Sequence, residues 1–354
     1  MPISAIDAFA PAFEHTERLL FQPFRLRYWF RIAIVGALSG ELSSGGCNLH
    51  ANFPSDVQMP TLPPELMAHQ ALFATLVTGV VLVGLAFFLL FLYIASRMRF
   101  ILFDAVVTGE CQIRESWRRH GKHGWRYFVW NLGMSLASLA TVLLLVGVPL
   151  AYLWALGWLQ EPKAHIAALV TTGVLCLLLV LASTAALAIV AVLAKDFVVP
   201  QMILEELTAM EGWRRLWQQI QADKGGYAGY IGMKILASIG ASILFGILGI
   251  ILAMALLLPM MGAGVAAVLA GHAAGLSWTV GTITLAVMAG LVALVLMIFA
   301  TSMIYTPVAI FFPAYSIYFY AGRYEALARL LWPPLPQAAA PALDPLATPP
   351  PPFV

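Results

Sequence analysis

The sequence predicts an all-α, polytopic integral membrane helix bundle, and three observations support this fold class. Of the 354 residues, 61% are hydrophobic and only 10% are charged, whereas ordinary globular domains are about 45–50% apolar and about 25% charged. Several uncharged stretches exceed the roughly 20 helical residues that cross a bilayer. Basic residues gather in alternate connections between these stretches. These features argue against a soluble enzyme, a nucleic-acid-binding protein and a secreted disulfide scaffold.

We expect about six transmembrane helices, over residues 28–46, 71–96, 127–159, 165–194, 228–258 and 277–306. The first is the weakest, because its apolar part is short and contains Glu41. A re-entrant or interfacial helix is the alternative there. Tyr28 and Trp29, flanked by arginines, are typical of an interface anchor. Gly36 and Gly40 form a GxxxG pair, which permits close contact between helices.

The distribution of positive charge predicts the orientation. With six crossings and both termini on one side, all of the 19 Lys and Arg residues except Lys163 fall on that side. Positive charge near short loops marks the cytoplasmic face. We therefore expect a bacterial inner-membrane protein whose N-terminus and C-terminus are both cytoplasmic. The outer loops would be 45–70, 160–164 and about 259–276, and the last, rich in glycine, could instead be re-entrant.

The chain is expected to have three parts, which are a cytoplasmic amphipathic segment (1–27), a membrane domain (28–331) and a disordered Pro/Ala-rich tail (332–354). An internal repeat is also predicted. The motif Glu-Ser-Trp-Arg-Arg at 115–119 recurs as Glu-Gly-Trp-Arg-Arg at 211–215, and a fainter copy lies at 18–29. The repeated unit would be a cytoplasmic helix followed by a membrane hairpin, present about three times.

Amphipathic helices are expected at the membrane surface. Residues 203–221 place apolar side chains at three- and four-residue spacing and charged ones on the other faces, the pattern of a helix that lies in the interface. A set of aromatic and basic residues would contact lipid head groups there: Trp117, Arg118, Arg119, Trp213, Arg214 and Arg215. The alternative is that most of these arginines only set the topology and pair with nearby carboxylates.

Part of the sequence resembles a known family. The stretch Lys-Asp-Phe-Val-Val-Pro at 195–200 is followed by two glutamates at 205–206, by the Trp-Arg-Arg motif and by Gly226-Tyr227. This resembles the membrane domain attached to some bacterial glycerophosphodiester phosphodiesterases, and related stand-alone bacterial membrane proteins of unknown function. The resemblance covers about 195–240, and residues 310–313 echo its turn before the last helix. No stretch here suits the soluble hydrolase barrel of about 250 residues, so the resemblance implies a membrane module without phosphodiesterase activity.

A search for chemistry finds no catalytic set. Phosphate-binding loops, GxSxG elbows and HExxH helices are absent from the sequence. His120 and His123 form an HxxH pair without convincing further ligands, so no metal or cofactor is expected. A membrane enzyme would need a cluster drawn from Asp104, Asp196, Glu110 and His120.

Ionisable residues inside membrane helices are candidates for function, because a charge in lipid is costly. Glu41, Asp104, Asp196 and Lys234 all lie near helix ends. Lys234 is expected to extend its amine towards the interface. Glu41 is a candidate pathway residue, with an interface position as the alternative.

The function expected from these observations is that of a lipid-contacting structural or accessory module without catalysis. Its partners would be membrane lipids, and either other membrane proteins or further copies of the chain, but not nucleic acid. A small-solute permease or channel is the alternative. It would require a continuous polar cavity that ends at Glu41 or at residues 259–276.

Overall fold

The computed structural model describes residues 3–41, 70–273 and 280–332. Over these ranges the chain is helical and contains no strand, so the all-α prediction is confirmed for them. The helices are α1 (Phe9–Phe21), α2 (Leu26–Ser39), α5 (Gln70–Thr108), α6 (Ile113–Arg119), α7 (Gly121–Ala155), α8 (Ile166–Leu193), the π-helix η1 (Ala194–Val198), α9 (Val199–Leu204), α10 (Ala209–Ala222), α11 (Lys224–Ala273), α12 (Val280–Ile304), α13 (Thr306–Ala321) and α14 (Glu325–Leu331).

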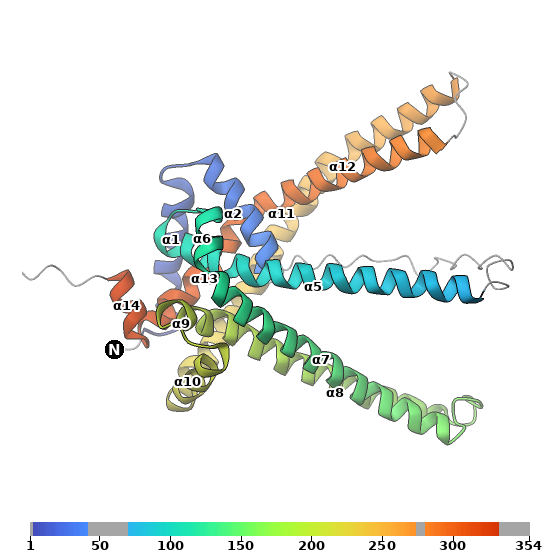
Figure 1. The fold of residues 1–354 in the computed structure, drawn as a ribbon, viewed down its shortest axis with the longest axis horizontal. Coiled ribbons are helices and arrows are strands. Elements are labelled where there is room, and N and C mark those ends of the chain that lie inside the picture. Colours follow the sequence, from blue (N-terminus) through green and yellow to red (C-terminus); the bar gives the residue numbers. More distant parts are fainter. Residues whose placement is uncertain (1–2, 42–69, 274–279, 333–354) are drawn as a thin grey trace, which may run out of the picture.

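The helices form a packed hub and three arms that diverge from it (Figure 1). We call the parts of α5, α7/α8 and α11/α12 that extend away from the hub the three arms. Helices α7 and α8 form one hairpin, and α11 and α12 form another. The hub consists of the short helices α1, α2, α6, α9, α10, α13 and α14 together with the nearby ends of the long helices.

Within the described ranges, five helices are long and apolar enough to cross a membrane, which indicates a multi-pass membrane protein. They are Val77–Thr108, Gly121–Ala155, Ile166–Leu204, Lys224–Gly271 and Gly281–Ile304. Large apolar side chains such as Val80, Leu143 and Leu285 are exposed along the arms. A helix that is apolar on every side fits the hydrocarbon of a bilayer, where no polar face is needed.

Two of the long helices continue beyond the predicted spans. Helix α5 runs on to Thr108, inside the hub. Helix α11 passes through Pro259 and ends at Ala273, so the prediction of a loop over 259–276 is wrong for its described part. The surrounding residues are apolar, and proline and glycine are tolerated in transmembrane helices more than in soluble ones.

The predicted first span, 28–46, is a shorter helix in its described part. Helix α2 has 14 residues and ends at Ser39, and the next residue, Gly40, has a positive φ of 77°, the left-handed conformation that terminates helices. At 1.5 Å per residue it is roughly 21 Å long, less than the thickness of a bilayer core. Gly36 lies against α13, where an added Cβ would come within 2.7 Å of Ala309. Of the predicted GxxxG pair, one glycine therefore permits close packing and the other ends the helix. Residues 42–46 lie outside the described ranges.

Helix α13 is the centre of the hub and was not predicted. Most of its side chains are buried, including Phe312, Tyr315, Phe319 and Tyr320. The predicted turn at 310–313 is wrong, because Pro313 lies inside α13. The similar stretch at 195–200 is also helical, with Pro200 in the first turn of α9, a position where its missing N–H is not needed.

The predicted amphipathic helix 203–221 is interrupted. Helix α9 ends at Leu204 and α10 begins at Ala209. The start of α10 is set by a capping box in which Thr208 and Glu211 each satisfy the other's backbone N–H. Trp217 and Met210 are exposed, whereas Leu216 is buried against the hub.

Charge follows the division between hub and arms. Every Lys and Arg except Lys163 lies in a hub helix, in a connection between hub helices or at the hub end of an arm. Lys163 lies in the turn between α7 and α8, at the far end of that arm. The N-terminal residues are also held in the hub, since Tyr315 and Arg323 donate hydrogen bonds to the carbonyls of Ala5 and Ile3.

Candidate functional site

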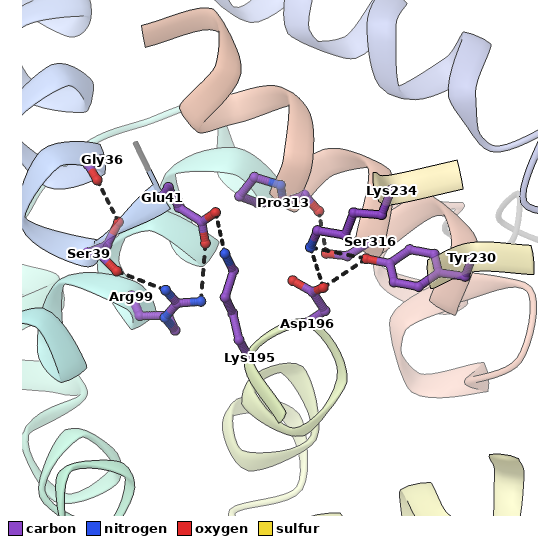
Figure 2. A network of polar contacts seen from close by, with 10 residues as sticks. All are labelled: Gly36, Ser39, Glu41, Arg99, Lys195, Asp196, Tyr230, Lys234, Pro313 and Ser316. Atoms are coloured by element: carbon purple, nitrogen blue, oxygen red, sulfur yellow. Dashed lines mark hydrogen bonds and ion pairs between the residues drawn. The ribbon is translucent and has the colours of Figure 1, made fainter. Parts of the chain in front are cut away.

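A buried network of charged residues lies where the three arms meet the hub (Figure 2). Arg99 comes from α5, Lys195 and Asp196 come from η1 at the end of α8, and Lys234 comes from α11. Glu41, just after α2, completes it. Each arm thus contributes at least one charge to a single cluster.

Glu41 holds two of the three cations. Its carboxylate oxygens lie 2.6 Å from Lys195 Nζ and 3.1 Å from Arg99 Nη1. Arg99 also donates to the carbonyl of Ser39 at 2.8 Å, which ties the end of α2 to α5. Burial alone would raise the pKa of Glu41, but the charges of Lys195, Arg99 and Lys234 outweigh it and lower the pKa to about 2.

Asp196 holds the third cation. Its carboxylate accepts hydrogen bonds from Lys234 and, at 2.9 Å, from the Tyr230 hydroxyl. Lys234 also lies over the rings of Tyr230 and Phe312 at 5.7 and 5.8 Å, and such cation–π contacts are favourable in a desolvated site. The Lys234 amine is therefore buried in an ion pair, and its expected reach towards the interface stays a prediction.

The π-helix places Lys195 and Asp196 for these two roles. The residues are consecutive, yet Lys195 turns to Glu41 and Asp196 turns to Lys234 (Figure 2). Single-turn π-helices often occur at functional sites. Here the π-helix lies at the junction between the arm helix α8 and the hub.

A small cavity lies inside the network. Its volume is about 20 Å³, and Glu41, Arg99, Lys195, Asp196 and Ser316 are among its lining residues. A space of this size holds about one water molecule. The network contains three cations and two carboxylates, so one positive charge is left over.

The predicted head-group residues occupy the hub near the start of the arms. The Trp117 ring lies under the Arg97 guanidinium at 4.7 Å and 6.3 Å from the Tyr93 ring, which in turn lies 6.1 Å from Trp125. Trp213 packs on Trp130 at 6.2 Å. These aromatic side chains lie between the apolar arms and the charged hub, the arrangement typical of a membrane–water interface.

The four predicted arginines differ in their partners. Arg119 pairs with Glu115 at 2.8 Å, and Arg215 pairs with Glu205. No ion pair or hydrogen bond is found for the side chains of Arg118 and Arg214 within 3–41, 70–273 and 280–332. Local carboxylate pairing, the alternative interpretation, thus describes two of the four.

The residues considered for catalysis come together only as a pair. His120 Nε2 lies 2.7 Å from Asp104 Oδ2, and the His120 and His123 rings are 6.1 Å apart. Asp196 belongs instead to the buried network, and Glu110 bonds Gln112. In the described part of the chain, no group of three His, Cys, Asp or Glu side chains is suited to hold a metal ion.

Sequence reasoning selected Glu41, Asp196 and Lys234 one by one and missed that they form one site. In the sequence, Arg99 and Lys195 stand out only as charges that set the topology. The available signal was that all five lie near the ends of apolar helices on the same side. Opposite charges at the same membrane depth tend to pair, since each alone would be costly.

Comparison with known proteins places the chain in a family. No curated protein and no solved structure matches the chain. The match that is found shows no link to glycerophosphodiester phosphodiesterases, so that resemblance stays a prediction. Residues 3–330 match a family described as "Family of unknown function (DUF7544)". Because this match covers most of the sequence, the chain belongs to that family.

Proposed function

We propose that the protein is a non-catalytic, lipid-contacting structural or accessory module of the bacterial inner membrane. The observation that supports this most strongly is the division of the molecule into exposed apolar arms and a hub with nearly all the basic residues. Arms of this kind are suited to contact acyl chains, and a hub of this kind is suited to lie on an anionic surface. Both termini and the hub are assigned to the cytoplasm, because positive charge marks that face.

The proposal includes six passages through the membrane. Glu41 lies in the hub, whereas α5 begins at the far end of its arm (Figure 1). The sixth passage is the one predicted from the sequence at 28–46, in addition to the five helices, and residues 42–46 of that range lie outside the described residues. An even number of passages agrees with the placement of α1 and α14, the first and last described helices, in the hub.

The proposal also includes a repeated plan. Helix α6 precedes the α7/α8 hairpin, and α10 precedes the α11/α12 hairpin. The Trp-Arg-Arg motifs at 115–119 and 211–215 lie in α6 and α10. In each motif the second residue, Ser116 or Gly212, is buried, and the tryptophan that follows packs on a neighbouring aromatic ring. Helices α1 and α2 come before α5 in a similar order. These correspondences support three related units arranged around one hub.

A permease or channel is the second candidate, and the buried network supports it. Ion pairs inside a membrane protein often mark solute or ion pathways. The cavity at Glu41 is only about 20 Å³, however, and is too small for a solute larger than water. The apolar arms also diverge from one another instead of enclosing a central space (Figure 1).

A flux assay separates the two candidates. The purified protein is reconstituted into liposomes loaded with potassium, chloride or a pH-sensitive dye, and a Glu41→Gln variant is reconstituted in parallel. We expect both proteins to leak no faster than empty liposomes, and the wild-type protein to retain phospholipid through purification. Flux that depends on the wild-type protein and disappears in the variant would overturn the proposal in favour of a permease.

A further inference from the structure

A wide basic groove lies beside α6, separate from the buried network. Its volume is about 1320 Å³ and it is open to the surface. The charged side chains in its lining are Arg31 of α2 together with Arg114, Glu115, Arg118 and Arg119 of α6. Four arginines against one glutamate leave three positive charges in the groove.

Two of these arginines are available to bind an anion. Arg119 already pairs with Glu115, and Arg31 donates to the carbonyl of Cys111 at 2.9 Å. No hydrogen bond or ion pair is found for the Arg114 and Arg118 side chains within the described ranges. They lie four residues apart on α6, on one face of the helix, so they repel each other until an anion lies between them. Arginine binds phosphate oxygens through two parallel hydrogen bonds.

The groove opens at the level expected for lipid head groups. Trp117 belongs to its lining and packs near Tyr93, where the exposed apolar side chains of the α5 arm give way to buried ones. Trp125, exposed at the start of α7, lies beside the same tyrosine. Aromatic residues of this kind gather at the membrane–water interface. The phosphates of a surrounding bilayer would therefore lie close to Arg114 and Arg118.

We propose that this groove binds the head group of a phospholipid that carries two phosphates. One phosphodiester would neutralise a single charge of the three and would fill only a small part of 1320 Å³. Two phosphates match the charge and the size better, with one held between Arg114 and Arg118 and the other near Arg31. The Trp117 ring contacts the apolar part of the lipid. This inference rests on the proposed function, since it assumes that the hub lies on the membrane surface.

The test measures binding of individual lipids to the full-length protein in detergent by native mass spectrometry. Cardiolipin, phosphatidylglycerol and phosphatidylcholine are titrated separately. The groove variant is Arg114→Gln with Arg118→Gln. The control variant is Lys163→Gln with Lys224→Gln, which removes the same charge from exposed sites outside the groove.

We expect cardiolipin to bind at least about tenfold more tightly than phosphatidylglycerol. Each basic residue near an anionic group contributes about a fivefold change in affinity. The affinity for cardiolipin should therefore fall about 25-fold in the groove variant and less than about threefold in the control variant. Equal affinity for the two anionic lipids, or equal losses in both variants, would overturn the inference alone. Failure of every phospholipid to bind would overturn the proposed function as well. Both pairs of substitutions are at exposed positions, and circular dichroism verifies that each variant folds.

Discussion

Asp196→Asn is the substitution that tests the buried network most specifically. The amide keeps the shape of the side chain and one acceptor oxygen for the Tyr230 hydroxyl, but it removes the charge that faces Lys234. The Asp196 side chain is 2% exposed and that of Lys234 is 8% exposed. Water therefore has little access to the unpaired ammonium. The other carboxylate of the network, Glu41, is already bound by two cations.

The expected loss of stability is large. Removing one partner of a buried ion pair costs about 3–5 kcal/mol, because the remaining charge is left without compensation. Since 1.4 kcal/mol is a factor of ten, the unfolding equilibrium should shift by more than about 100-fold. In the double variant, with Asp196→Asn and Lys234→Met, no unpaired charge remains at this position. Its loss should be below about 2 kcal/mol, so the two changes should be strongly coupled.

The assay is urea unfolding of the purified full-length protein in a mild detergent, followed by tryptophan fluorescence. An exposed pair provides the control, since Glu325 and Arg329 are 78% and 71% exposed and Glu325→Gln should cost less than about 0.5 kcal/mol. A loss below about 1 kcal/mol for Asp196→Asn would refute the reasoning. A double variant as unstable as the sum of the two single variants would refute it too.

Three further predictions concern the hub. The pKa of Glu41 is lowered from 4.5 to about 2, so its ionised carboxylate contributes about 3 kcal/mol to the free energy of unfolding. This contribution is complete above pH 4.5 and is lost as the pH falls towards 2. Acid unfolding curves should show the loss in the wild type and not in Glu41→Gln. Gly36→Ala should cost about 1–3 kcal/mol by overpacking against α13, whereas Gly133→Ala, which meets no neighbouring atom, should be neutral or stabilising in thermal unfolding. Arg323→Gln removes the bonds to Asp223, just after α10, and to the N-terminal segment, so limited proteolysis should cut that segment faster than in the control Arg329→Gln. The first prediction would be contradicted by equal acid unfolding curves for the wild type and Glu41→Gln. The second would be contradicted by equal stability changes for Gly36→Ala and Gly133→Ala, and the third by equal cleavage rates for Arg323→Gln and Arg329→Gln.

The long helices were predictable because composition alone determines them. An apolar run of 20 or more residues has few alternatives to a membrane helix. Their ends were less predictable. Helix α11 continues past Pro259, and α5 continues into the hub. In both helices the residues near the end are compatible with a helix in lipid and with a helix buried in protein, so the local sequence does not mark where the helix ends. Helix α13 was missed because its buried aromatic residues give no amphipathic period, and Pro313 resembled the end of a helix.

The site was predictable only as separate residues. Glu41 was selected because a carboxylate in an apolar segment is costly. Its partner Lys195 is 154 positions away in the sequence, and no local pattern relates the two. The pairing depends on how the α2 end, α5 and η1 converge, which is a property of the tertiary structure. Similarly, the basic groove combines Arg31 with residues of α6 that follow about 80 positions later.

The central claim is that the hub with its basic residues lies on one face of the membrane and the arm tips lie on the other. Cysteine accessibility in intact cells tests it most directly, in a variant whose three native cysteines are replaced by serine. We predict that a membrane-impermeant maleimide labels Lys163→Cys from outside, and labels Lys122→Cys only after the membrane is permeabilised. Labelling of both positions from the same side would contradict the claim.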